Sequence, residues 1–115
     1  MKDNFKFYTY ILSCDDGSFY TGITSDVERR FCEHYFKEKT CAKYTKSHQV
    51  QRIEAVFESE TKSAASKLEY HIKHLSKSKK IDIVNSKKDL TFGNIVFHCL
   101  PVPSTKEIIE KYNKK

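Results

Sequence analysis

Residues Tyr8 to His34 read YTYILSCDDGSFYTGITSDVERRFCEH, and the predicted fold is organised around them. It begins inside Phe5–Ser13, a segment rich in aromatic and β-branched residues that predicts a β-strand. An Asp-Asp-Gly-Ser turn follows, in which Gly17 provides the positive φ of a hairpin. The chain then returns as a second strand over Phe19–Thr21, which Gly22 should close. Alternation along the first strand places three side chains on one face: Tyr8, Tyr10 and Leu12.

A helix is expected directly after the hairpin. Ser25 to Glu28 matches a capping box, so the helix should begin at about Asp26 and end at about Lys37. Arg30 and His34 lie on one stripe of this helix because they are four residues apart. The buried stripe beside it has the same spacing: Val27, Phe31 and Tyr35. Phenols, a guanidinium and an imidazole are therefore gathered early in the chain, an arrangement suited to holding a phosphate.

The segment after this helix, Glu38–Gln51, is polar and rich in lysine and is expected to be a loop. Basic side chains are interleaved in it with an aromatic one: Lys39, Lys43, Tyr44, Lys46 and His48. Such a mixture suits a nucleic-acid backbone and a stacked base, and a solvated loop explains it equally well. Arg52–Glu58 alternates and predicts a third strand.

Two helices are predicted next. The first is capped by Thr61 or Ser63 and buries one stripe: Ala65, Leu68, Ile72 and Leu75. The second is short, covers Lys79–Val84 and should pack through Ile81 and Val84.

The C-terminal part should contain a strand and a helix. Leu90–Leu100 is apolar enough for a strand, although Gly93 weakens it, and two prolines follow. Ser104 to Glu107 is a second capping-box match. It opens a terminal helix whose apolar residues are Ile108, Ile109 and Tyr112.

Together these elements indicate an α/β protein of the α+β kind. We expect a small antiparallel sheet of about three strands flanked by helices, with a C-terminal strand and helix as an extension. The 115 residues suffice for one domain with a single core of modest size. Residues 1–84 should form the main domain, and residues 85–115 an extension packed on it.

Composition indicates a folded protein with a polyanionic partner. An apolar fraction of 38%, 31% charged residues and only three glycines and two prolines exclude a disordered or linker-rich chain. The 21 Lys and Arg outnumber the 15 Asp and Glu and give a net charge of +6, which favours nucleic acid as the partner. The alternative is a basic surface that only aids solubility.

The cysteines show neither a CxxC pair nor the Cys/His spacing of a zinc finger: Cys14, Cys32, Cys41 and Cys99. We therefore expect reduced thiols and no zinc site or disulfide framework. The sequence contains no charged-then-apolar leader and no apolar run of membrane-spanning length. We expect a cytoplasmic protein with no membrane partner.

Five residues, taken in order, resemble the signature of the GIY-YIG nuclease superfamily, and most closely that of its small stand-alone bacterial members: Tyr10, Tyr20, Arg30, His34 and Glu69. Residues 8–10, Tyr-Thr-Tyr, stand in the place of the first motif, and residues 20–22, Tyr-Thr-Gly, in the place of the second. Further matches are Asp26–Arg30, Ala42–Thr45 and Leu68–Lys73. The resemblance covers roughly Phe7 to Val84 and marks residues 1–84 as the nuclease-like domain.

The chain departs from the family pattern at several positions. Tyr8 stands where the first motif has its glycine, and Thr9 and Thr21 replace the isoleucines. Arg30, not Arg29, lies at the distance from the second motif where the family keeps its arginine. The segment after residue 84 lies outside the resemblance.

The resemblance implies a metal-dependent endonuclease acting on DNA, with structure-selective cleavage and RNA substrates left open. One divalent ion, Mg²⁺ or Mn²⁺, would bind Glu69. Tyr10 would be the general base or would orient water, and Tyr20 would position water and phosphate. Arg30 would bind the scissile phosphate, and His34 would shuttle a proton or contact the phosphate. A free phenol has a pKa near ~10, so the base role requires cations that lower it.

Four residues are candidates for holding the nucleic acid: Lys43, Tyr44, Lys46 and Lys73. The chain has room for the catalytic module and a short tail, so a homodimer or a partner protein would supply any targeting.

Taken singly, these residues have plainer explanations. Strand tyrosines usually pack, a helix arginine is usually solvated, and Glu69 four residues before Lys73 is the favourable order for a surface ion pair. Two other functions follow from these explanations. One is a nucleic-acid-binding module that keeps the nuclease fold without cleavage, and the other is an interaction protein that dimerises through the C-terminal strand and helix.

Overall fold

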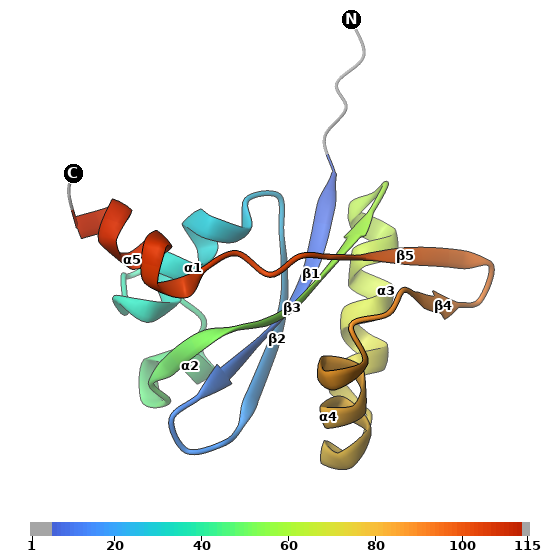
Figure 1. The fold of residues 1–115 in the computed structure, drawn as a ribbon, viewed down its shortest axis with the longest axis horizontal. Coiled ribbons are helices and arrows are strands. Elements are labelled where there is room, and N and C mark those ends of the chain that lie inside the picture. Colours follow the sequence, from blue (N-terminus) through green and yellow to red (C-terminus); the bar gives the residue numbers. More distant parts are fainter. Residues whose placement is uncertain (1–5, 114–115) are drawn as a thin grey trace, which may run out of the picture.

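The computed structural model describes residues 6–113 and contains one antiparallel sheet of five strands. The strands are β1 Phe7–Cys14, β2 Phe19–Thr24, β3 Val50–Ser59, β4 Leu90–Phe92 and β5 Ile95–Leu100. The helices are α1 Val27–Tyr35, α2 Lys43–Ser47, α3 Lys62–Lys73, α4 Lys77–Ser86 and α5 Thr105–Asn113. The sheet order is β2-β1-β3-β5-β4, with α1, α2 and α5 on one face and α3 and α4 on the other (Figure 1). The α+β class is confirmed.

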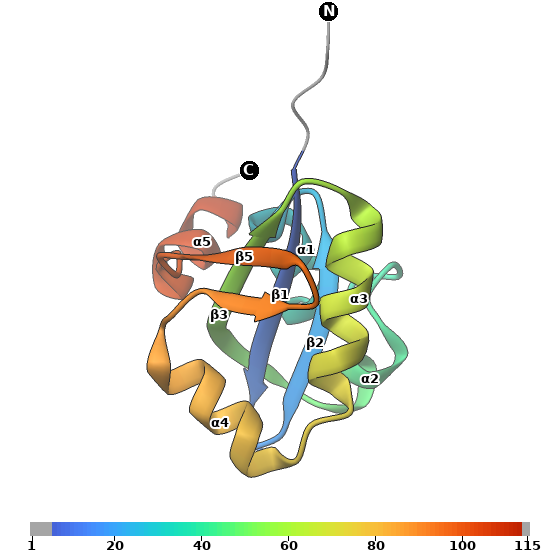
Figure 2. The ribbon, with the colours of Figure 1, turned by 90° about the vertical axis from the view of Figure 1, so that its right-hand side faces the viewer.

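β1 and β2 form the predicted hairpin. Gly17 has a φ of 85° in its turn, and the ladder pairs Tyr10 with Gly22 and Tyr8 with Thr24. This pairing carries β2 past Gly22, where the sequence predicts its end. β1 lies between β2 and β3, so β2 is an edge strand with α3 beside it (Figure 2).

Alternate side chains of β1 enter two separate cores. Tyr10 and Leu12 pack with Phe31 of α1, whereas Ile11 packs on the opposite face with Leu68 of α3. The predicted alternation along the first strand is therefore confirmed, as is the predicted α3 stripe for Ala65, Leu68 and Ile72, because each helix covers one face of the same strand. Leu75 lies beyond the end of α3 at Lys73 and is only partly buried, so its predicted place in the buried stripe is wrong.

Helix α1 begins one residue later than its capping box predicts. The N-cap is Asp26 and not Ser25, and the Asp26 carboxylate accepts a hydrogen bond from the Arg29 backbone N–H at 3.1 Å. The helix ends before Lys37, which adopts a left-handed φ of 53°. The predicted caps of α3 and α5 are confirmed, since Thr61 and Ser104 each accept from a backbone N–H in the first turn.

The predicted loop over Glu38–Gln51 contains a short helix, α2, and the first residues of β3. The helix has a single fully buried residue, Thr45. Its anchor is polar, so it leaves no apolar stripe in the sequence.

Helix α4 is longer than predicted, because Ser76 caps it through a hydrogen bond from the Lys79 N–H at 3.3 Å. It packs through Val84, as predicted, and through Ile83. Ile81 is 39% exposed, so its predicted packing role is wrong.

The predicted strand over Leu90–Leu100 is a hairpin of β4 and β5. Gly93, with a φ of 64°, forms the turn between them. β5 pairs with β3 through Val56–Glu58, which gives the sheet five strands where about three are predicted. Beyond it, α5 lies against α1 and stacks Tyr112 on Phe36 at 4.7 Å between ring centroids.

Among residues 6–113, no helix is both long enough and apolar enough to cross a membrane. Cys14, Cys41 and Cys99 are free thiols.

Candidate active site

The candidate site lies along β2, where α1 approaches one face of the sheet and α3 the other (Figure 2). The ring centroids of Tyr10 and Tyr20 are 6.3 Å apart, and those of Tyr20 and His34 are 5.1 Å apart. Gly22 makes room for both phenols, because a Cβ at this position would lie 2.5 Å from Tyr10 Oη and 3.1 Å from Tyr20 Cε2. Gly22, in the second motif, is therefore needed to leave room for the side chain of Tyr10, in the first.

A chain of hydrogen bonds fixes Tyr10 and His34. Tyr10 Oη lies 2.9 Å from His34 Nε2, and His34 Nδ1 lies 2.8 Å from Thr45 Oγ1. The Thr45 hydroxyl donates to the carbonyl of Ala42 at 2.9 Å, so it accepts from Nδ1. His34 then carries its proton on Nδ1, and Nε2 accepts the hydroxyl proton of Tyr10.

Both members of this pair are uncharged at neutral pH. The pKa of His34 is lowered to about 4, first by burial and then by the positive charge of Arg30, against an opposing effect of Glu33. The pKa of Tyr10 is raised far above its usual value, first by burial and then by Tyr20, while Arg30 acts in the opposite direction. Tyr10 is thus a hydrogen-bonded phenol and not a resting phenolate.

Arg30 is held in place beside Tyr10. Its Nη1 donates to Glu33 Oε1 at 2.6 Å and to the carbonyl of Thr40 at 2.7 Å. Burial lowers the pKa of Arg30, but Glu33 and Tyr10 raise it more, so the net shift is upward. Because the side chain keeps 23% of its surface exposed, the cation is fixed and still accessible to a ligand.

Helix α3 brings Glu69 and Lys73 to the same place. Lys73 Nζ lies 3.1 Å from Glu69 Oε2 and 5.7 Å from the centroid of the Tyr20 ring. The carboxylate of Glu69 is close enough to Tyr10 to help raise the pKa of that phenol. The predicted ion pair of Glu69 is therefore present, and it lies within the cluster of the five motif residues.

The residues that α3 contributes to the site, Glu69 and Lys73, form its α3 side. This side fits a divalent ion that keeps most of its water. Glu69 offers one carboxylate, and within residues 6–113 no group of three or more His, Cys, Asp or Glu could enclose a metal. Mg²⁺ commonly binds through only one or two carboxylates and retains several waters. An ion at Glu69 would have to compete with the ammonium of Lys73.

The predicted nucleic-acid contacts are divided between α2 and α3. Lys43 and Lys46 are exposed on α2. Tyr44 stands between two rings, with His48 stacked on it at 3.8 Å and Tyr20 at 6.0 Å between centroids. A base could stack on the His48 side of Tyr44 only if His48 moved away.

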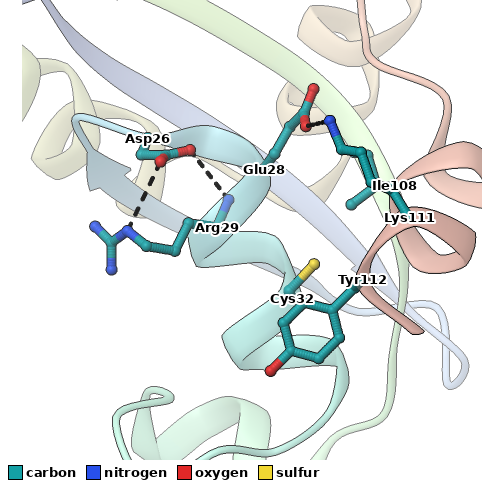
Figure 3. A pocket seen from close by; sticks show the side chains of 7 residues that line it. All are labelled: Asp26, Glu28, Arg29, Cys32, Ile108, Lys111 and Tyr112. Atoms are coloured by element: carbon teal, nitrogen blue, oxygen red, sulfur yellow. Dashed lines mark hydrogen bonds and ion pairs between the residues drawn. The ribbon is translucent and has the colours of Figure 1, made fainter. Parts of the chain in front are cut away.

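Two of the hollows beside α1 lie differently with respect to the motif residues. One, between α1 and α5, contains the Glu28–Lys111 ion pair and none of the five motif residues (Figure 3). The other, of about 330 Å³, is lined by Arg30 and by the ends of β2 and α3. Of these two hollows, the second adjoins the candidate site, because Arg30 lines it.

The roles of two residues of the site are missing from the sequence predictions. Glu33 could have been found, because it lies three residues after Arg30 and four after Arg29, the spacing of helix ion pairs. Thr45 lies within the Ala42–Thr45 match to the family, but its bond to His34 has no local signal, since the two residues are eleven positions apart.

The model of the GIY-YIG catalytic domain matches residues 6–82. The chain therefore belongs to the GIY-YIG superfamily of nucleases. The site described above lies within the matched region. The predicted resemblance is thereby confirmed.

The chain is similar to several small proteins of one group. It is 47% identical over 79 residues to UPF0213 protein FN1575 of Fusobacterium nucleatum, an overlap of 69% of this chain and 77% of that protein. It is 44% identical over 80 residues to UPF0213 protein BH0048 of Halalkalibacterium halodurans, covering 70% of this chain and 83% of that protein. A solution NMR structure of UPF0213 protein BH0048 from Bacillus halodurans has 40% identity, covers 71% of this chain and 85% of its own, and gives a TM-score of 0.45.

Proposed function

We propose that the protein is a metal-dependent endonuclease that hydrolyses phosphodiester bonds in DNA. Its membership of a nuclease superfamily supports hydrolysis of nucleic acid in general. One observation carries the specific proposal: Tyr10, bonded to His34, lies within electrostatic reach of both Arg30 and Glu69. Groups that can bind a phosphate, accept a proton and hold a cation thus meet at one strand edge.

Arg30 binds the scissile phosphate in this proposal. A guanidinium has five N–H donors, and the contacts with Glu33 and Thr40 use only Nη1. The other nitrogens that do not face Tyr10 can serve the phosphate oxygens. A cation already fixed before substrate binds needs little reorganisation to stabilise charge that develops in the transition state.

Tyr10 and His34 accept the proton of the attacking water. Arg30 helps keep the pKa of His34 near 4, so a phosphate that neutralises Arg30 makes His34 a stronger base. The hydroxyl of Tyr10 then takes a proton from water while it passes its own proton to His34 Nε2. The phenol never has to exist as a free phenolate, which removes the difficulty of its high pKa.

Glu69 would hold the divalent ion, Mg²⁺ or Mn²⁺. When bound, such an ion supplies positive charge to the phosphate oxygens and lowers the pKa of coordinated water. Tyr20 is half-buried and lies next to both Tyr10 and Lys73. It positions the water and the phosphate between the α1 and α3 sides.

DNA is the proposed substrate, with RNA as the second choice, because the candidate groups at the site would contact the phosphodiester that both share. Lys43, Tyr44, Lys46 and Lys73 contribute contacts to the nucleic acid. A homodimer or a partner protein would supply targeting, and we place the activity in the cytoplasm.

A second function is favoured by the position of Lys73. Its ammonium lies 3.1 Å from Glu69, where a metal would otherwise bring positive charge. A site already supplied with a cation could hold nucleic acid without cutting it. The protein would then be a binding module with the nuclease fold.

Cleavage assays separate the two functions. Purified protein is incubated with plasmid, branched and single-stranded substrates and Mg²⁺ or Mn²⁺, beside Tyr10→Phe, Arg30→Ala and Glu69→Ala. We expect all three variants to lose cleavage by about 100-fold or more, the scale of losing one stabilising group, while Glu69→Ala still binds DNA. Unchanged cleavage by Glu69→Ala would refute the metal role. A wild type that binds these substrates but leaves them intact in the presence of Mg²⁺ or Mn²⁺ would favour the binding module.

A further inference from the structure

The hollow beside Arg30 gathers cations that the five motif residues do not account for. It is lined by Arg29 and Arg30 of α1 and Lys62 of α3, together with one carboxylate, Glu33. The hydroxyl-bearing residues at the end of β2 and just beyond it, Thr24 and Ser25, complete its wall together with Phe7 and Ile23. Counting the Asp26 carboxylate at the rim as well, three cations against two carboxylates leave a surplus of positive charge next to the proposed scissile phosphate.

Arg29 is already restrained at the rim of this hollow. Its Nη1 lies 2.8 Å from Glu33 Oε2. Its Nε lies 3.8 Å from Asp26 Oδ2, an ion pair drawn in Figure 3. The side chain nevertheless keeps 56% of its surface exposed. It can therefore reach an anion without leaving its ion pairs.

Lys62 is placed where the fold itself gains nothing from a cation. It is the first residue of α3, and the first turn of this helix contains no acidic residue. A positive charge at a helix N-terminus opposes the helix macrodipole. Lys62 is exposed, and within residues 6–113 no carboxylate lies at ion-pair distance from its ammonium. An anionic ligand would relieve both effects.

We propose that Lys62 and Arg29 form a second phosphate-binding subsite, which holds a phosphate of the cut strand next to the one at Arg30. The proposal rests on the function proposed above and extends it. Because β2 has six residues, at about 3.3 Å each it is about 20 Å long, enough to border several nucleotides at about 3.4 Å of rise. The nucleic-acid strand would pass along β2. Lys62 would lie on one side of the scissile phosphate, and Lys73 and α2 on the other.

Binding as a function of salt tests the subsite without requiring cleavage. Labelled oligonucleotides are titrated by fluorescence anisotropy in EDTA over a series of NaCl concentrations, with wild type, Lys62→Ala and Lys62→Arg. We expect Lys62→Ala to weaken binding about three- to tenfold at low salt and to reduce the slope of log K against log[salt] by about 0.7–0.9, the value of one phosphate contact. Lys62→Arg should bind as the wild type does.

Lys106→Ala is the matched control, since Lys106 is an exposed lysine near the start of another helix, α5. It removes the same charge and should leave the slope unchanged. An unchanged slope in Lys62→Ala, or an equal loss in Lys106→Ala, would overturn the subsite.

Oligonucleotides with one methylphosphonate linkage locate the contact. The wild type should lose affinity when one particular linkage beside the cut site is neutral, and Lys62→Ala should show no further loss at that linkage. A wild type that binds but never cuts refutes the nuclease function and leaves the salt slope to decide the subsite. If the wild type cuts and the Lys62→Ala variant cuts equally well, the subsite is refuted and the nuclease function is not.

Discussion

The two sides of the candidate site are built differently. On the α1 side, Tyr10 and His34 are buried and Arg30 is tied to a carboxylate and a backbone carbonyl. On the α3 side, Glu69 is 24% exposed, much as Arg30 is, but among residues 6–113 its carboxylate pairs only with Lys73, whose side chain is 46% exposed. Rigid groups suit a phosphate whose geometry is the same in every substrate, whereas a loosely held carboxylate suits a hydrated ion that must enter and leave. The difference predicts that the α1 side governs stability and transition-state binding, and the α3 side metal affinity.

Replacing Gly22 should disturb the α1 side most. In Gly22→Ala the new Cβ would overlap the Tyr10 hydroxyl, which cannot withdraw because His34 holds it. We expect a loss of about 3 kcal/mol in the free energy of unfolding, at the upper end of overpacking costs, measured by urea denaturation. Gly22→Ala combined with Tyr10→Phe should recover part of the loss, because the hydroxyl is the nearest atom. A stable Gly22→Ala would show that the Tyr10 phenol does not lie against β2.

Acid should destabilise the protein through His34. The folded-state pKa of about 4 lies below the unfolded value of 6.5, so between these values only the unfolded state binds the proton. The contribution of His34 to the free energy of unfolding is fully present above its unfolded-state pKa of 6.5 and is lost as the pH falls toward 4. Between pH 7 and pH 5 the loss should be about 2 kcal/mol.

The variant His34→Gln separates this effect from all other titrations. Urea denaturation gives the free energy of unfolding at pH 7 and at pH 5. The difference between these two values should be smaller in His34→Gln than in the wild type by about 2 kcal/mol. Equal pH dependence in the two proteins would mean that His34 is not held neutral.

Removing the charge of Glu33 should loosen Arg30 without unfolding α1. In Glu33→Gln we expect kcat for cleavage to fall about tenfold with little change in KM, because the lost alignment acts on the transition state. Glu28→Gln is the control, since Glu28 is on the same helix and pairs with Lys111 of α5. A change in KM alone, or an equal loss in Glu28→Gln, would assign Glu33 a merely structural role.

The α3 side should show the smallest effect. Lys73→Met removes the competitor for Glu69 while keeping a long side chain, and we expect it to tighten Mg²⁺ binding a few-fold, as expected when a weak exposed ion pair is lost. Isothermal titration in the absence of DNA measures this directly. Weaker metal binding in Lys73→Met would contradict competition between the ammonium and the ion.

The sequence predicts the elements that carry the candidate site better than the connections between them. The hairpin, the helix carrying Arg30 and His34 and the stripe of α3 all follow from local patterns, and these elements place the motif residues. Helix α2 was not predicted because its anchor, Thr45, is buried through a hydrogen bond to His34 and not through an apolar stripe.

The same limit applies to the C-terminal part and to Gly22. Gly93 could either weaken one long strand or form the turn between two short ones. The pairing of β5 with β3 decides between these, and β3 is distant in the sequence. Gly22 marks a strand end by sequence, whereas its role is to let the Tyr10 phenol pass over β2. Contacts between separate elements decide both cases.

Paramagnetic broadening by Mn²⁺ in ¹H–¹⁵N NMR spectra tests the central claim most directly, since it locates a bound ion without requiring cleavage. Signals of Glu69, Lys73 and the middle of β2 should broaden first in the wild type and remain sharp in Glu69→Gln. Broadening centred on the acidic residues between α1 and α5, or the same pattern in both proteins, would contradict a site in which Glu69 faces Tyr10 and Arg30.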